Sequence, residues 1–305
     1  MVVAQQMGIF FILMAVGYIA RKVNLFDEQM LPHLSTIIVK ICGPALILTG
    51  AIDSTNQMDS AQVLTVFATL GIVTAVMTAV AFVVPRLLRY PKRMYGLVNF
   101  GFWMTNTGYI GMPFIASIWG SDALIYMTFY LIINNAMLYS YGIALASHGA
   151  EGQPRFNLRQ LINPGNVATI LTIIIYFGGI PVTDVLAEPI RLLGHATAPL
   201  AMMLVGAQLA GVDLRTFVDG RLGIFVLVKM IVFPILILLA CKPFVSDPLL
   251  MGACLTVVAM PTGVLVGAFA QLYNPPLAPE ASKLVGATTL VAVLTIPLVS
   301  FVCGL

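Results

Sequence analysis

Long apolar runs separated by short polar breaks dominate this chain. A helix that spans a membrane needs about 20 apolar residues, and most of the runs approach or exceed that length. The breaks carry charged residues together with Pro and Gly, which end helices and permit tight turns. The pattern predicts an all-α membrane protein of ten transmembrane helices, over Val3–Ala20, His33–Ile52, Ala61–Val84, Tyr95–Trp119, Ala123–Ser147, Asn166–Gly179, Leu192–Ala210, Leu222–Cys241, Leu249–Leu272 and Ser282–Cys303.

Composition strengthens this interpretation. Of the 305 residues, 60% are hydrophobic and 9% are charged, against about 25% charged in a typical soluble domain. Such an exterior needs lipid, so the bilayer of the inner or plasma membrane is the expected partner. The net charge of +3 is small and scattered, which predicts no nucleic-acid partner. The first 20 residues lack the basic start of a signal peptide, and we expect them to remain as the first helix.

Cysteines and enzyme motifs add no further chemistry. The four cysteines stand singly within or beside apolar runs and form no CxxC pair, which favours buried thiols over disulfides or a metal site. The sequence contains no GxSxG, HExxH, P-loop or GxGxxG motif. We therefore expect neither an enzyme nor a bound cofactor, and no nucleotide-driven pump.

The distribution of Lys and Arg predicts an orientation. Eleven of the 15 lie in odd-numbered connections, two lie in even-numbered ones, and two lie within helices. Positive residues favour the cytoplasmic side. The odd connections are therefore expected to be cytoplasmic, with both termini outside.

Five helices in each half predict an internal repeat. Because five is odd, residues 151–305 would cross the membrane inverted relative to residues 1–150, as in many secondary transporters. Sequence echoes support this prediction: Pro44 corresponds to Pro199, and Pro113 corresponds to Pro261.

Two predicted helices carry helix-breaking residues at mid-membrane depth. Irregular backbone inside lipid is tolerated where it lines a cavity, and paired breaks in the two halves of a transporter point to its substrate site. A broken helix exposes N–H groups and a positive dipole end that attract anions. Ordinary proline kinks are the alternative. The candidate residues are Asn106, Thr107, Gly108, Gly111 and Pro113 in the fourth helix, and Pro261, Thr262 and Gly263 in the ninth.

Other polar residues lie inside the apolar runs. Lys229 is expected to face the interior and balance an anion, or else to extend to the interface, and the second reading suits Lys40 better. Asn134, Asn135 and Gln208 either line the path or bond between helices. No Asp or Glu lies deep in a run, which argues against a cationic substrate.

The broken-helix motifs resemble a known family. NTGYIGMP (Asn106–Pro113) and AMPTGVLVGAFAQLYN (Ala259–Asn274) are similar to helices 4 and 9 of the auxin efflux carrier family. KVNLFDEQMLPHLSTIIVKICGPALI and the C-terminal GATTLVAVLTIPLVSFVCGL fit the family as well. The likeness runs nearly end to end. The compact form resembles bacterial members described as malate or malonate permeases.

The resemblance implies a site and a motion. Helices 4 and 9 would cross at Pro113 and Pro261, Asn106 would hold the substrate carboxylate, and Asn134 would line the same pocket. A scaffold part and a moving transport part are implied, with elevator-like motion. One departure concerns helix 3, where PIN-type carriers have an Asp and a Lys. Here the stretch offers only Asp59, at its edge, which puts proton coupling in doubt.

The sequence thus predicts alternating-access transport of a small organic anion, an auxin-like monocarboxylate or a malate- or malonate-type dicarboxylate. A homodimer is compatible with this plan. Three alternatives stay open: a sodium-coupled carrier of the bile-acid-transporter type, a non-transporting membrane sensor and, least favoured, a membrane enzyme.

Overall fold

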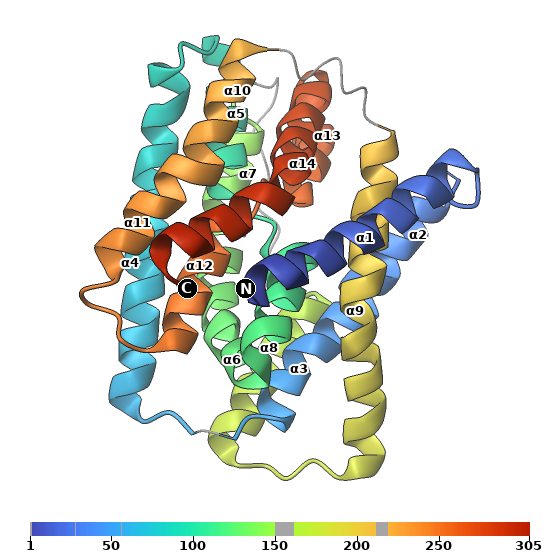
Figure 1. Ribbon diagram of the computed structural model, residues 1–305, viewed down its shortest axis with the longest axis vertical. Helices are drawn as coiled ribbons and strands as arrows, with labels where there is room; N and C mark the ends of the chain where they lie inside the picture. Colours follow the sequence, from blue (N-terminus) through green and yellow to red (C-terminus); the bar gives the residue numbers. More distant parts are fainter. Residues whose placement is uncertain (1, 28, 56, 150–161, 212–218) are drawn as a thin grey trace.

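The chain folds as an all-helical bundle in the computed structural model (Figure 1). The structure describes all residues except 1, 28, 56, 150–161 and 212–218. In the first half the elements are α1 (Val2–Lys22), α2 (Met30–Ile37), α3 (Gly43–Ile52), α4 (Ser60–Leu87), α5 (Tyr95–Trp103), α6 (Met112–Met137) and α7 (Ile143–Ala146). In the second half they are α8 (Pro164–Gly178), α9 (Asp184–Ala210), α10 (Gly220–Leu227), α11 (Phe233–Cys241), α12 (Pro248–Ala259), α13 (Val264–Tyr273) and α14 (Ala278–Cys303).

Short π-helical turns join several of these helices into longer ones. They lie at Ile38–Cys42, Thr107–Gly111, Leu138–Gly142 and Val228–Val232. Counting through them, seven helical segments of the described chain are long and apolar enough to cross a membrane, and α8, α12 and α13 are shorter apolar helices. The expected all-α, multi-pass membrane architecture is therefore confirmed. The predicted junction of the two repeats, at residues 150 and 151, lies outside the described residues.

The longest segment, Thr107–Ala146, bends where the sequence predicts a helix boundary. Gly120 interrupts α6 with a φ of 76° and a ψ of −168°, a conformation that glycine adopts without steric cost. The boundary predicted between Trp119 and Ala123 lies at this bend.

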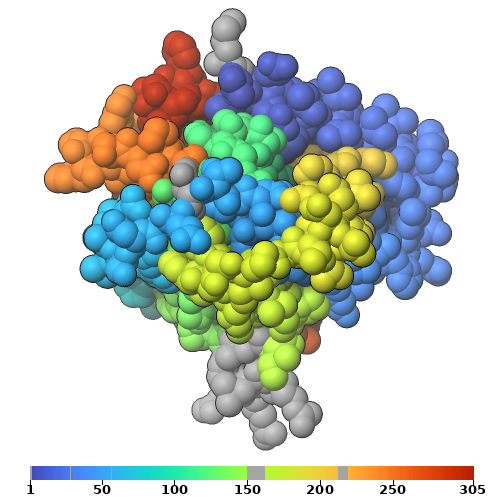
Figure 2. Space-filling view, turned by 90° about the horizontal axis from the view of Figure 1, so that it is seen from below, coloured from blue at the N-terminus to red at the C-terminus, as the bar shows by residue number. Residues whose placement is uncertain are grey.

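Connections gather at two opposite ends of the bundle (Figure 1). One end joins α4 to α5 and α13 to α14, and a cavity there is lined by Tyr90, Asp219 and Glu280. The other end joins α3 to α4 and α8 to α9, where the Met58 N–H donates to the Tyr176 hydroxyl at 2.8 Å. Figure 2 shows this second end from below, with the light-blue start of α4 next to the yellow-green α8–α9 connection. We call these the odd end and the even end, after the connections that they contain.

Helices α1 and α9 cross at very short range. A Cβ added to Gly17 would lie 1.9 Å from the Met203 carbonyl oxygen, and one added to Gly206 would lie 1.9 Å from the Met14 oxygen. Only glycine fits at both positions, because the two backbones touch there. This crossing holds α1 and α9 as one rigid pair beside the rest of the bundle.

Candidate functional site

Two interrupted helices cross at the centre of the bundle. Helix α5 ends at Trp103 and the chain resumes helical form at Thr107; α12 ends at Ala259 and α13 begins at Val264. The two breaks pair through one antiparallel bridge between Thr105 and Thr262. We call residues 104–106 the first break and residues 260–263 the second break.

Main-chain hydrogen bonds join the two breaks. The Asn106 N–H donates to the Pro261 carbonyl at 2.7 Å, and the Gly263 N–H donates to the Met104 carbonyl at 2.8 Å. Backbone groups released by a broken helix must find partners inside a membrane protein. Each break therefore supplies the partners of the other, which fixes their mutual position.

The side chain of Thr262 completes the second break. Its hydroxyl donates to the Gly101 carbonyl at 2.7 Å, and its N–H donates to the hydroxyl of Thr288, on α14, at 3.0 Å. Thr262 is fully buried. Its polar groups are thus committed to holding α5, the second break and α14 together.

The first break keeps a free donor. Asn106 is 3% exposed, and its side-chain oxygen accepts from the Tyr109 N–H at 3.3 Å. The side-chain nitrogen, Asn106 Nδ2, has no hydrogen-bond partner among the described residues. Leaving a buried donor unpaired costs about 1–3 kcal/mol, so this amide is suited to a ligand acceptor.

A cavity of about 510 Å³ adjoins this amide. Its wall combines Asn106 with residues from the start of α2, the end of α9, the start of α13 and the first half of α14. The start of α2, the end of α9 and the first half of α14 adjoin odd-end connections, and α13 runs from the second break toward that end, so the cavity lies on the odd side of the crossing. None of the described residues that line it is charged, and its polar side chains are Ser35, Asn106, Gln208, Ser282 and Thr289.

The N-terminus of a half-helix is centred on the same amide. Asn106 is the cap residue of the π-helical turn Thr107–Gly111, which continues into α6. The first N–H groups of a helix have no intrahelical partner, and the aligned peptide dipoles place partial positive charge there. The cavity wall therefore offers a positive helix end and a free amide donor at one point.

Residues after Asn106 have different surroundings. Thr107 is 2% exposed and begins the π-helical turn, and a Cβ added to Gly108 would meet nothing within 4 Å. A Cβ added to Gly111 would lie 2.9 Å from Thr256 Cγ2, so this glycine permits close packing on α12. The site thus holds Asn106 at the crossing, with Thr107 and Gly108 beside it.

The expectation that Pro113 marks the crossing is wrong. Pro113 lies in the first turn of α6, beyond the bridge between Thr105 and Thr262. Pro113 directly follows the π-helical turn Thr107–Gly111, and such a turn interrupts the i→i−4 hydrogen bonds of the helix, so the missing N–H of proline is accommodated there. Pro261, by contrast, lies within the second break and accepts the bond from Asn106.

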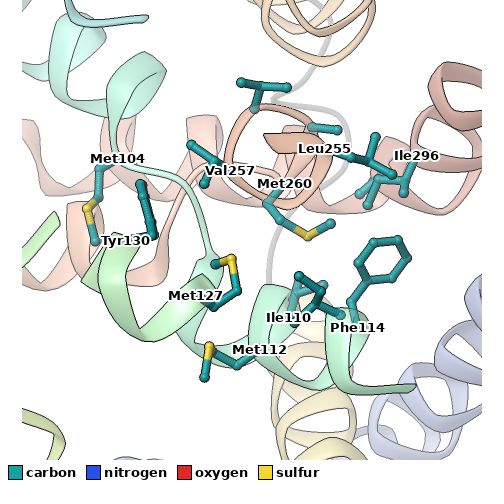
Figure 3. Close-up of a cluster of buried hydrophobic side chains, with 14 of the residues drawn as sticks. Met104, Ile110, Met112, Phe114, Met127, Tyr130, Leu255, Val257, Met260 and Ile296 are labelled. Carbon is teal, nitrogen blue, oxygen red and sulfur yellow. The ribbon is translucent and has the colours of Figure 1, made fainter. Parts of the chain in front are cut away.

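Asn134 lies near the crossing but outside the cavity wall. It is 4% exposed, and its side-chain oxygen accepts from the Tyr130 hydroxyl at 3.3 Å. Tyr130 lies close to Met104 of the first break in Figure 3, among the apolar side chains that surround the crossing. Asn134 thus belongs to the packing behind the first break.

Lys229 also lies outside the cavity wall. It is 1% exposed, lies in the π-helical turn Val228–Val232, and donates from Nζ to the Phe102 carbonyl at 2.7 Å. Instead of facing the cavity, its ammonium group contacts the C-terminal end of α5.

The remaining polar candidates have different positions, and only one of them lines the cavity. Gln208 lines the cavity. Asn135 donates to Asn166 Oδ1 at 2.5 Å and therefore joins two helices. Lys40 is exposed on its helix, and Asp59 caps α4 in a reciprocal pair of bonds with Gln62.

Sequence reasoning missed the contribution of α14 to the cavity. Ser282, Gly286 and Thr289 line it, and their spacing of four and three residues places them on one face of a helix. This small, polar stripe within an apolar run is the signal that could have identified them.

Comparison with known proteins agrees with this architecture. A family model described as "Membrane transport protein" matches residues 2–300. A protein of Methanothermobacter thermautotrophicus described as an "Uncharacterized transporter" is 25% identical over 201 residues. That alignment covers 65% of this chain and 65% of the relative, so the chain spans slightly less than two thirds of it. The resemblance to auxin efflux carriers is confirmed by the family match, and the chain belongs to the membrane transport protein family.

Proposed function

We propose that this protein is a secondary transporter that binds the carboxylate of a small organic anion at the crossing of its two broken helices. The unpaired Nδ2 of Asn106 on the cavity wall carries this proposal. A carboxylate oxygen would accept from this donor and lie at the positive end of the half-helix that begins at Thr107. The substrate is an auxin-like monocarboxylate or a malate- or malonate-type dicarboxylate.

Electrostatics favours an anion over a cation at this position. The cavity wall supplies amide and hydroxyl groups and no carboxylate among its described residues, so a desolvated cation would lack a counter-charge. The positive helix end would oppose it further.

The opposite end of the bundle supports alternating access. Ser54 Oγ and the Thr55 N–H donate to Asp122 Oδ1 at 2.8 and 2.9 Å. These bonds tie the connection after α3 to the segment after Gly120. A smaller cavity of about 270 Å³ lies at this tie, and the larger one, beside Asn106, lies on the odd side. The arrangement fits a state in which the site is reached from the odd end, and transport would alternate it with a state reached from the even end.

The ten-helix plan completes the proposal. Two inverted five-helix repeats would place helix boundaries at the bend at Gly120 and interruptions after α5 and α12, and these features support the plan. The rigid α1–α9 pair would belong to the scaffold, and the crossing helices would move as an elevator-like transport part. The odd end would be cytoplasmic, with both termini outside; Arg155, Arg159 and Arg215 of the supporting charge count lie outside the described residues.

Transport into vesicles tests the proposal. Purified protein would be reconstituted, and uptake of radiolabelled phenylacetate, malate and malonate measured. We expect uptake of at least one of them. Asn106→Ala would weaken its apparent affinity by about 1–3 kcal/mol, roughly five- to 150-fold. Gln271→Ala, which removes an exposed amide on α13, is the matched control. Absence of uptake of all three probes, or equal transport by Asn106→Ala, would refute the proposal.

A further inference from the structure

A buried lysine lies behind the crossing, at the C-terminal end of the helix that leads into it. Lys229 Nζ donates to the carbonyl of Phe102, the penultimate residue of α5. The same ammonium group lies 5.5 Å from the centre of the Phe102 ring. Among the described residues, no carboxylate forms an ion pair with it. The proposed function leaves this charge unexplained, because Lys229 does not line the cavity.

Three side chains on one face of a helix fix this contact. Phe225, Lys229 and Phe233 are spaced four residues apart along the α10–α11 segment, so they share a face. The Phe102 ring packs edge-on against both phenylalanines, with ring centres 6.0 Å from Phe225 and 5.3 Å from Phe233. These ring contacts fix the position of Phe102, so its carbonyl lies within hydrogen-bond distance of the Lys229 ammonium group.

The location matters because a broken helix brings two opposite dipole ends together. The half-helix from Thr107 presents its positive end to the first break, whereas α5 presents its negative end to the same break. A carboxylate beside Asn106 would be attracted by the first and repelled by the second. An anion site at such a break needs the end of α5 to be neutralised.

Each of three carbonyls near the end of α5 has a donor. Phe100 accepts from the Met104 N–H at 2.8 Å, and Gly101 accepts from the Thr262 hydroxyl at 2.7 Å. These two donors are neutral. The third donor, Lys229 on Phe102, is the only one of the three that can carry a positive charge. In the part of the chain that the structure describes, no Lys or Arg side chain donates to a carbonyl of α12, so the second break has no equivalent.

We propose that Lys229 is a positioning residue that makes the first break selective for anions, by neutralising the negative end of α5 without touching the solute. The inference rests on the proposed function and adds the source of its charge selectivity. A lysine inside a membrane protein costs about 2.5–3.5 kcal/mol on insertion scales, and a neutral donor would suffice for a purely structural bond. A charged donor differs from a neutral one in the electrostatic field that it produces at the first break, and this field would favour anions.

Two variants separate charge from structure. Lys229→Met keeps length and removes the charge, whereas Lys229→Arg keeps the charge. Apparent affinities would be measured by competition for two acid–amide pairs, phenylacetate with phenylacetamide and malonate with malonamide. We expect Lys229→Met to weaken binding of the acid that the wild type transports by about tenfold, while binding of its neutral amide changes less than about twofold. Lys229→Arg would recover most of the acid affinity.

A second readout needs no ligand. Trp103 follows Phe102 directly and is 1% exposed, so its fluorescence responds to the local field. In a Trp119→Phe background, which leaves Trp103 as the sole tryptophan, we expect an emission shift in Lys229→Met and little shift in Lys229→Arg.

The outcomes are distinct. Equal losses for acid and amide would make Lys229 a structural anchor and overturn the inference, as would unchanged acid affinity in Lys229→Met. If the wild type transports none of the carboxylates, the proposed function fails, and the anion selectivity inferred for Lys229 falls with it. The emission spectra would then still decide whether the lysine sets the field at the first break, and identical spectra would reject that as well.

Discussion

The two helix breaks use the same backbone device for different purposes. Each gives up helical hydrogen bonds, and each recovers them from the other through the pairs Asn106–Pro261 and Gly263–Met104. The first break then retains an unpaired amide nitrogen on Asn106, a residue of the cavity wall. At the second break both the N–H and the hydroxyl of Thr262 are bonded to protein. The first break is thus available to bind a solute, whereas the second break holds the first in position.

The asymmetry extends to charge. Lys229 donates to the end of the helix that precedes the first break. The second break instead contains Pro261 and two hydrogen bonds donated by Thr262. The proposed inverted repeat would therefore not give two equal half-sites. In the proposed mechanism the first break supplies the recognition of the anion, and the second supplies rigidity.

The largest effect on binding is expected from reversing the preference of the first break for anions. Asn106→Asp keeps the shape of the side chain but replaces its donor with a carboxylate. Two like charges in close contact cost several kcal/mol, so affinity for a transported carboxylate should fall on the order of a hundredfold or more. Competition binding measures this fall. Carboxylate affinity retained within about threefold would show that the solute does not approach Asn106. The proposed difference between a binding break and a structural break would then be wrong.

A smaller effect, on stability, is expected at the second break. Thr262→Val keeps side-chain volume and removes the buried bond to the Gly101 carbonyl. The free energy of unfolding should fall by about 1–3 kcal/mol, measured by unfolding in detergent, with ligand affinity reduced less than in Asn106→Ala. Thr65→Val, at an exposed threonine bonded within its own helix, is the control and should change stability by less than about 0.5 kcal/mol. Lost binding with unchanged stability would contradict the assigned role.

An effect on stability of similar size is expected at the contact between the half-helix and α12. Gly111→Ala would place a Cβ 2.9 Å from Thr256 Cγ2, and such overpacking costs about 1–3 kcal/mol. Gly108→Ala, three residues earlier, meets nothing within 4 Å, and should leave stability unchanged or raise it by up to about 1 kcal/mol. Thermal unfolding of both variants measures the contrast. Equal stabilities would indicate that the half-helix does not pack on α12 as described.

Much of this arrangement could be predicted from the sequence. Apolar runs and polar breaks indicate the membrane-crossing helices, because lipid demands long apolar segments. Proline and glycine locate the second break directly, at Pro261 and Gly263, whereas the first break lies just before the glycines and proline that point to it, at residues 104–106. Asn106 was identified because it is a polar side chain within such a break.

The partners at the crossing could not be read from the sequence. Pro113 and Pro261 look equivalent in the motif, yet Pro113 lies inside a helical segment, directly after a π-helical turn, and the bridge forms at Thr105. Lys229 bonds to a main-chain carbonyl from a distant helix, and a carbonyl has no signature in the amino-acid sequence. The cavity likewise depends on how α2, α9, α13 and α14 converge, which no local pattern encodes.

Ligand-dependent thermal stabilisation tests the central claim most directly. A ligand that binds only the folded protein raises its stability according to its concentration relative to Kd. Wild type, Asn106→Ala and Gln271→Ala would be heated with phenylacetate, malate, malonate and the matching neutral amides. We predict that at least one carboxylate stabilises the wild type and Gln271→Ala well above its amide, and that Asn106→Ala loses most of this difference. Equal stabilisation of all three proteins, or none by any carboxylate, would contradict an anion site at the first break.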